Sequence, residues 1–160
     1  MKFNIGAKGL LQENNQVLFI EYEIDGVLYY ALPGGAIEPN ETLADCVVRE
    51  FWEETQIAIK AEQLLLVNEF INKNPKGVAD DWKNGIHQIE IIFKVSRTSP
   101  IDTLHKLIKP KADFGMKGIK WLDKKALSSI KYYPDKAVDW FFQDAEIDEI
   151  TPNMYQMKYQ

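Results

Sequence analysis

The sequence predicts an α+β fold in which a mixed β-sheet is flanked by helices. Short apolar segments bounded by turn residues fill the first part of the chain, an amphipathic helix follows, and further strand-like segments come after it. A second helical segment lies near the C-terminus, so that the sheet is expected between helices. With 160 residues, 46% of them hydrophobic, the chain is expected to form one domain over residues 1–160.

Composition narrows the classes of partner. Net charge is −5, from 24 acidic and 19 basic residues, whereas proteins that bind long nucleic acid usually carry a basic surface. No apolar run approaches the ~18 residues of a membrane span, and no signal-like segment opens the chain. The single cysteine, Cys46, excludes an intrachain disulfide. We therefore expect a cytoplasmic protein that binds neither membranes nor long nucleic acid.

The N-terminal segments predict antiparallel strands joined by tight turns. The candidate strands cover residues 2–12, 16–22 and 27–31. Asn14-Asn15 and Asp25-Gly26 are residues typical of hairpin turns. Gly34-Gly35 follows the third strand, and its glycines permit a backbone path that brings amide or carbonyl groups close to a ligand.

The central helix is predicted from about Thr42 to Thr55. Residues 42–45 match a capping box, which places the helix start at Thr42. The side chains expected on the buried face are Ala44, Val47, Val48, Phe51 and Thr55. The charged residues lie on the other side of the helix, facing a cleft.

Glu50, Glu53 and Glu54 are spaced at i, i+3 and i+4, so they share one helix face. Two like charges about 4 Å apart repel by roughly 1 kcal/mol in water and about 4 kcal/mol near a protein surface. The cluster also lies toward the helix C-terminus, where the macrodipole disfavours negative charge. A solvated acidic helix end is one interpretation. The other is a site for a hard divalent cation, Mg²⁺ or Mn²⁺, because the ligands are all oxygen atoms.

The spacing upstream of these acids favours the second interpretation. From Gly35, five residues lead to Glu41, and seven more lead to Arg49 and Glu50. Residues 35–57 therefore resemble the Nudix hydrolase box, in which G, E, REU, EE and GU recur at this spacing and U is a bulky apolar residue. The matching positions are Gly35, Glu41, Arg49, Phe51, Glu50, Glu53, Glu54 and Ile57.

Gln56 departs from the box, which usually has glycine at this position. We interpret that glycine as a left-handed residue that ends the helix. Gln at this position is expected to cost about 1 kcal/mol and to leave the carboxylates in place.

The resemblance implies a Nudix-type α/β/α sandwich and a hydrolase that cleaves the diphosphate linkage of a nucleoside diphosphate derivative. Mg²⁺, with Mn²⁺ as a substitute, would be held by Glu50, Glu53 and Glu54. A backbone carbonyl of Gly34 or Gly35 would complete the metal shell. The implied substrates are ADP-ribose, a sugar nucleotide or a nucleoside triphosphate.

Arg49 and Glu41 are expected to support the reaction rather than take part in it. The guanidinium of Arg49 can brace Glu41, Asp45 or the neighbouring Glu50, and so orient the metal ligands. A simple i,i+4 surface pair with Asp45 is the alternative, worth only a few tenths of a kcal/mol.

The general base is left open between four carboxylates. Glu53 and Glu54 are favoured within the helix. Asp113 lies just before a predicted strand, 117–122, where the family often places a further carboxylate, and that strand carries Trp121. Glu90, on a predicted strand at 86–95, is the rival, and it faces either the acidic cluster or solvent.

The rest of the chain offers weaker signals. Trp82, in the polar loop 72–85, either stacks on a nucleobase or packs on the loop itself. His87 is expected to be a half-buried strand residue rather than a catalyst. One or two strands are predicted at 57–70, a short helix at 123–127 and a second helix at 135–144. The tail from about residue 145 is expected to be flexible or to form a dimer contact, with a homodimer favoured.

Two other functional classes stay open. A catalytically silent domain of this fold could bind a nucleotide as a sensor or regulator, although such domains generally lose box acids that this chain keeps. An isomerase acting on a prenyl diphosphate has a related scaffold, but no cysteine lies outside the helix to act as its acid.

Overall fold

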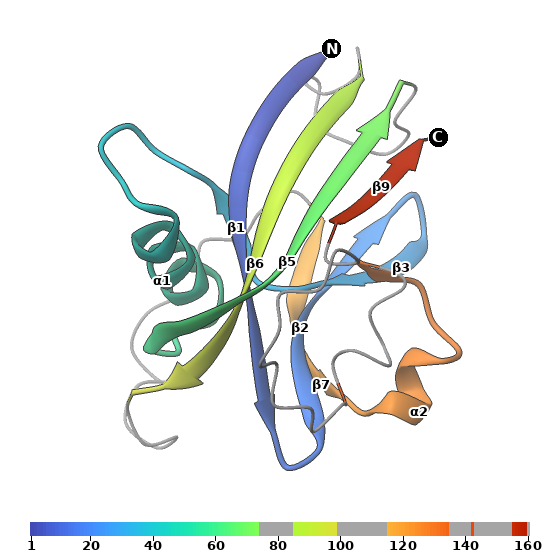
Figure 1. The fold of residues 1–160 in the computed structure, drawn as a ribbon. Coiled ribbons are helices and arrows are strands. Elements are labelled where there is room, and N and C mark those ends of the chain that lie inside the picture. The colour runs from blue at the N-terminus through green and yellow to red at the C-terminus, as the bar shows by residue number, and fades with distance from the viewer. Residues whose placement is uncertain (74–84, 99–114, 135–141, 143–154, 160) are drawn as a thin grey trace.

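A curled, mixed β-sheet forms the body of the protein, as the computed structural model shows (Figure 1). The structure describes residues 1–73, 85–98, 115–134, 142 and 155–159. The strands are β1 (Lys2–Glu13), β2 (Gln16–Ile24), β3 (Val27–Ala31), β4 (Gly34–Ala36), β5 (Ile59–Asn72), β6 (Ile86–Arg97), β7 (Met116–Leu122), β8 (Tyr132–Tyr133) and β9 (Tyr155–Tyr159). The helices are α1 (Leu43–Thr55) and α2 (Lys124–Leu127).

Strand β1 connects the two halves of the sheet. The strand order is β8-β3-β2-β1-β6-β5-β9, with β4 paired to β1 and β7 paired to β2. β1 and β2 are antiparallel and meet at Asn14 and Asn15, which both have positive φ. β1 and β6 are parallel. The predicted hairpins and the predicted mixed sheet are therefore both confirmed.

The sheet curls far enough to bring distant strands together. Asn68 of β5 donates a hydrogen bond to the hydroxyl of Tyr133 on β8, and Phe70 packs edge-on against the same tyrosine ring at a centroid distance of 5.6 Å. β8 and β5 lie near opposite ends of the strand order. The concave side of the sheet is therefore an interior, filled by a core cluster that includes Phe19, Leu32 and Ile92.

Helix α1 packs on the other side of the sheet and begins and ends as predicted. Thr42 is its N-cap, and its hydroxyl accepts a hydrogen bond from the Asp45 N–H at 3.1 Å. Gln56 ends the helix in the left-handed region, with φ 59° and ψ 22°, and its N–H donates to Trp52 O at 2.9 Å. A Cβ on Gly9 of β1 would lie 2.7 Å from the Phe51 ring, so the helix and the strand are in close contact there.

The predicted buried face of this helix was partly wrong. Val47, Phe51 and Thr55 are buried, but Ala44 is exposed and Val48 is only partly buried. Cys46 and Glu54 are buried instead. Leu43 at the start of the helix packs only partly against the core and Cys46 is its first fully buried side chain, so Ala44 between them faces solvent.

The downstream segments follow the predictions in outline. β5 is one long strand, β7 contains Trp121, and Asp123 caps α2 by accepting a hydrogen bond from Ala126 N–H at 2.7 Å. The tail is not only a flexible end or a dimer contact, because β9 adds to the sheet as a parallel partner of β5. The predicted helix at 135–144 lies largely outside the described residues. Neither helix in the described part of the chain has the length and apolar character needed to cross a membrane.

Candidate active site

Two adjacent glycines, Gly34 and Gly35, let the turn before α1 lie in close contact with β1 and with a side chain of α1. Gly34 lies opposite Lys8 in the β1–β4 pairing and has φ 139°, and a Cβ placed on it would lie 2.1 Å from Ala7 O. A Cβ on Gly35 would lie 2.5 Å from the carboxyl carbon of Glu50. The missing side chain at Gly35 therefore makes the space that the Glu50 carboxylate occupies.

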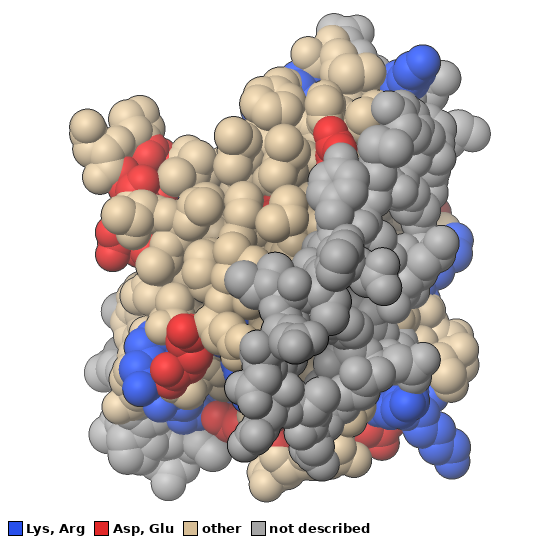
Figure 2. All heavy atoms as spheres, in the orientation of Figure 1, with Lys and Arg blue, Asp and Glu red and all other residues tan. Residues whose placement is uncertain are grey.

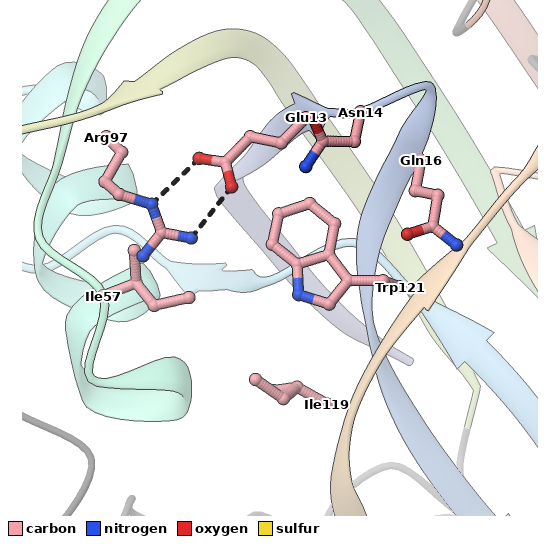
Figure 3. A pocket seen from close by; sticks show the side chains of 7 residues that line it. All are labelled: Glu13, Asn14, Gln16, Ile57, Arg97, Ile119 and Trp121. Carbon is pink, nitrogen blue, oxygen red and sulfur yellow. Dashed lines mark hydrogen bonds and ion pairs between the residues drawn. The ribbon is translucent and has the colours of Figure 1, made fainter. Parts of the chain in front are cut away.

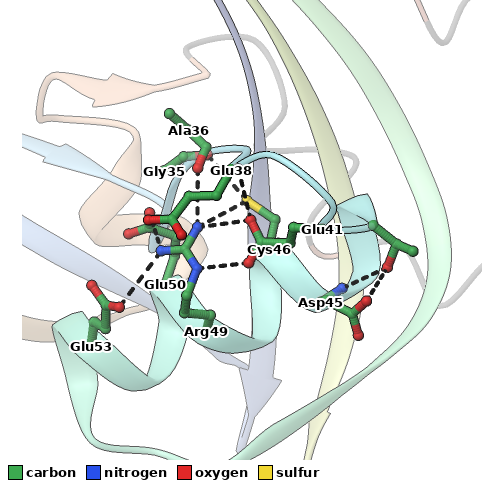
Figure 4. A network of polar contacts seen from close by, with 10 residues as sticks. Gly35, Ala36, Glu38, Glu41, Asp45, Cys46, Arg49, Glu50 and Glu53 are labelled. Carbon is green, nitrogen blue, oxygen red and sulfur yellow. Dashed lines mark hydrogen bonds and ion pairs between the residues drawn. The ribbon is translucent and has the colours of Figure 1, made fainter.

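Arg49 is the centre of the polar network on α1 (Figure 4). Its Nε and Nη2 donate to the two carboxylate oxygens of Glu41 at 2.7 and 2.9 Å, a bidentate pair. Nη1 donates to Glu50 Oε1 at 2.7 Å and lies 3.6 Å from Glu53 Oε1. Nη2 also donates to Ala36 O at 3.1 Å. One guanidinium thus joins three box carboxylates to the backbone of the turn.

The same network sets the protonation of its members. The hydrogen bonds from Arg49 lower the pKa of the Glu41 carboxyl to about 2, and contact with Glu41 raises the pKa of Arg49 above its usual range. Burial, followed by the charge of Glu41, raises the pKa of the Cys46 thiol to about 11. Asp45 bonds to its own N-cap residue Thr42 instead of Arg49. Glu41 and Arg49 therefore stay charged over the whole physiological pH range.

Glu54 turns away from the guanidinium. Its side chain is buried, its Oε2 accepts a hydrogen bond from the Gly34 N–H at 2.8 Å, and its Oε1 lies 3.4 Å from the Tyr22 hydroxyl, which donates to it. Glu50 and Glu53, by contrast, are drawn to Arg49. In the described part of the chain, no group of three or more His, Cys, Asp or Glu side chains is arranged as a metal site. The predicted ligands share one helix but do not converge as a single set.

The donor atoms nevertheless suit a hard divalent cation. All are oxygens, and the Glu50 carboxylate lies directly against the Gly35 backbone. Gly34 O accepts a hydrogen bond from Lys8 Nζ at 2.9 Å, and Cys46 Sγ lies 3.6 Å from Gly35 O. A carbonyl oxygen has a second lone pair in each case. The residues present therefore fit Mg²⁺ by their chemistry.

Glu90 does not face solvent. It is 2% exposed, and Gln88 Nε2 and Asn68 Nδ2 donate to its carboxylate oxygens at 2.8 and 3.3 Å. Lys8 Nζ lies 3.7 Å from its Oε1 and also bonds to Gly34 O. Glu90 is thus linked to the turn through a lysine that sequence reasoning missed. The signal was present, because Lys8 interrupts an otherwise apolar stretch of β1.

Of the remaining candidate residues, only His87 lies in the part of the chain that the structure describes. Trp82 and Asp113 fall outside the described residues, so their predicted roles stay predictions. His87 is half-buried, as expected, and its Nε2 pairs with Glu69 Oε1 at 2.6 Å. In the space-filling view, the middle of the face over β1 and β6 is mostly uncharged, whereas charged side chains appear near its upper end (Figure 2). Phe3 of β1 is 57% exposed.

Trp121 lines a separate pocket of about 180 Å³ near the β1–β2 turn (Figure 3). Arg97 in its wall is neutralised by Glu13, to which its Nε and Nη2 donate at 2.8 and 3.1 Å. Pockets that bind drug-sized ligands usually measure about 300 Å³ or more. We therefore place the candidate active site at the glycine turn and α1, not in this pocket.

Comparison with known proteins identifies the family to which the chain is similar. A family model described as the NUDIX domain matches residues 3–141. An ADP-ribose pyrophosphatase of Methanocaldococcus jannaschii is 32% identical over 90 residues, which are 56% of this chain and 48% of that protein. Phosphatase NudJ of Escherichia coli K12 is 29% identical over 62 residues, 39% of this chain and 40% of that one. The chain thus spans less than half the length of these relatives.

Solved structures share the fold. A MutT protein of Methanosarcina mazei Go1 superposes with a TM-score of 0.59 at 20% identity, over 87% of this chain and 90% of that one. The box residues, the fold and a family model that spans most of the sequence lead to one conclusion: the chain belongs to the Nudix family.

Proposed function

We propose that this protein is a metal-dependent hydrolase that cleaves the diphosphate linkage of a nucleoside diphosphate derivative by attack of water on phosphorus. The observation that carries the proposal is the Glu50 carboxylate held between the Gly35 backbone and Arg49. A solvated acidic helix end needs neither a glycine to make room for the acid nor a bidentate arginine behind it. Such positioning is what electrostatic catalysis of phosphoryl transfer requires.

Glu50, Glu53 and Glu54 would hold Mg²⁺, with Mn²⁺ as a substitute, and the carbonyls of Gly34 and Gly35 are further candidate ligands. The bound ion would neutralise charge on the phosphates and lower the pKa of the attacking water. We propose that the groups around these acids, Arg49 and the glycine turn, keep the carboxylates charged and oriented toward the diphosphate.

Glu53 is our preferred general base. Its side chain is 29% exposed, which lets it reach a water molecule, whereas Glu54 is buried and accepts a hydrogen bond from the Gly34 N–H. Glu41 and Arg49 orient the acids without reacting. Asp113 and Glu90 stay the alternative bases.

ADP-ribose is the substrate we favour among the expected classes, because the Methanocaldococcus relative that shares 32% of 90 residues is named for it. Other sugar nucleotides and nucleoside triphosphates follow. Trp82 is proposed to stack on the base and Glu90 to contact the substrate. We further propose that residues 1–160 form one cytoplasmic domain, with a homodimer as its assembly.

The test is a panel of nucleoside diphosphate derivatives incubated with Mg²⁺, with Mn²⁺ and with chelator. Glu53→Gln is compared with wild type, and Glu62→Gln is the matched control because Glu62 pairs with Lys60 at 3.0 Å on the surface of β5. Metal-dependent cleavage that is lost in Glu53→Gln and kept in Glu62→Gln supports the hydrolase. If no compound is cleaved while a nucleotide raises Tm, the protein is a sensor instead.

A further inference from the structure

Lys8 is a nearly buried cation that the box does not contain. Its side chain is 14% exposed, and a lysine is rarely removed from water to this extent without partners. Nζ donates to Gly34 O at 2.9 Å and lies 3.7 Å from Glu90 Oε1. The first distance is a hydrogen bond, and the second is an ion pair without a direct hydrogen bond.

The contact with Gly34 O fixes one of two peptide planes at the glycine turn. The Gly34 carbonyl belongs to the plane shared with Gly35, and Lys8 holds it. The Gly34 N–H belongs to the preceding plane, and Glu54 Oε2 holds it at 2.8 Å. A charged side chain therefore forms a hydrogen bond with the peptide group on each side of Gly34, which has φ 139°. Because glycine turns easily about both of its bonds, these two contacts limit its motion.

The plane that Lys8 holds leads directly to the acid cluster. Gly35 is so close to Glu50 that a Cβ on it would lie 2.7 Å from both carboxylate oxygens. A rotation of the Gly34–Gly35 peptide would therefore move the backbone against which Glu50 rests. It would also move the Gly35 carbonyl.

Glu90 supplies the negative charge that lets Lys8 stay charged although its side chain is nearly buried. Its carboxylate accepts hydrogen bonds from Gln88 and Asn68, and its negative charge faces Nζ. This part of the network is a counter-charge, which any buried lysine needs. It is separable from the bond to the turn, because Glu90 and Gly34 contact Lys8 as independent partners.

We propose that Lys8 is a positioning residue, which acts through the Gly34–Gly35 peptide to hold Glu50 and the Gly35 carbonyl in place for the diphosphate. This inference rests on the proposed hydrolase function. It assigns a catalytic effect to a residue that contacts none of the box acids.

The experiment is a double-mutant cycle of Lys8→Met and Glu90→Gln, with Lys8→Arg as the conservative variant and Lys60→Met as a control on an exposed lysine of β5. The measurements are urea unfolding for stability, kcat and KM with the cleaved compound, and amide hydrogen exchange at Gly35, whose N–H belongs to the peptide plane that Lys8 holds. In Lys8→Met we expect kcat to fall about 10- to 100-fold with KM changed less than about threefold. We expect exchange at the Gly35 amide to become faster.

The Glu90→Gln background separates the two roles of Lys8. Removing both charges should restore most of the stability lost in Lys8→Met, while kcat stays about 10- to 100-fold below that of Glu90→Gln alone. Lys8→Arg should recover part of kcat, and Lys60→Met should change neither quantity. If Lys8→Met has no effect on kcat in the Glu90→Gln background, Lys8 is only a counter-charge and the proposal is overturned.

Hydrogen exchange keeps this inference distinct from the proposed function. If wild type cleaves no compound in the panel, the hydrolase proposal fails. The exchange rates then show whether Lys8 holds the Gly34–Gly35 peptide in place. Faster exchange at Gly35 in both Lys8→Met and the double variant then supports the positioning contact. Unchanged exchange overturns it.

Discussion

Alanine substitutions at the two neighbouring glycines should separate folding from activity. At Gly35 the new methyl group meets the end of a flexible side chain, the Glu50 carboxylate, at 2.5 Å from its carbon. At Gly34 it meets backbone atoms of a central strand, Ala7 O at 2.1 Å and Lys8 Cα at 2.7 Å. The same added methyl should therefore have opposite consequences.

The magnitudes follow from these distances. Carbon atoms in contact lie about 3.5 to 4.0 Å apart, so Gly35→Ala pushes the Glu50 carboxylate by about 1 Å. A displacement of that size at a reacting centre costs about 100-fold in rate, or roughly 2.7 kcal/mol in the activation barrier. The free energy of unfolding should change by less than about 1 kcal/mol, since the carboxylate can move and alanine lowers the entropy of the unfolded chain.

Gly34→Ala should instead lower stability. The backbone of β1 cannot move aside without disturbing its pairing with β6, and φ 139° strains any residue with a Cβ. Overpacking and backbone strain together give about 2 to 5 kcal/mol.

The assays are urea unfolding followed by circular dichroism and kcat/KM with the cleaved compound, both on purified variants. Gly35→Ala should keep the unfolding midpoint of wild type and lose about 100-fold in kcat/KM. Full activity in a well-folded Gly35→Ala would show that the position of Glu50 does not matter. An equal loss of stability in both variants would refute the distinction between side-chain and backbone contacts.

Three further predictions concern single groups. Arg49 lowers the pKa of Glu41 to about 2 from an ordinary value of 4.5, so the stability that this pair adds is complete above about pH 4.5 and is lost as pH falls toward 2. Urea titrations at several pH values should show this loss, and the loss should be smaller in Glu41→Gln. Gln56→Gly should raise the free energy of unfolding, measured by urea unfolding, by up to about 1 kcal/mol, because glycine adopts the left-handed conformation without strain. Loss of the hydrogen bond from the Gln56 side chain to Trp52 O should offset part of this gain. Cys46, with a thiol pKa of about 11, should resist iodoacetamide at pH 8 in the folded protein and react after unfolding, as read by mass spectrometry.

Local features of the site could be predicted from the sequence because they depend on neighbours along the chain. Thr42 was expected to cap the helix, and the left-handed turn at Gln56 was expected from the glycine that the box usually has there. Helical spacing alone places Glu50, Glu53 and Glu54 on one stretch of helix. These results need only the 3.6-residue period and the rules for helix ends.

Which partner each acid takes was decided by the tertiary structure. Glu54 turns to Gly34 N–H while Glu50 turns to Arg49, although both stand on the same face of the helix. The choice depends on where the glycine turn lies relative to α1, which is set by the pairing of β4 with β1. Helical periodicity carries no information about that register. The exposure of Ala44 has the same origin, since periodicity does not say at which turn a helix meets the sheet.

The family, the helix and its acids could therefore be predicted without the structure, because they are encoded within about 25 consecutive residues. The contacts of Lys8 and Glu90 join residues of β1, β4 and β6 that lie 26 or more positions apart. Only folding of the sheet brings them together, since strand register and sheet curvature arise from the packing of the whole chain. The sequence identifies the acids of the proposed hydrolase, and the tertiary structure decides which groups hold them in place.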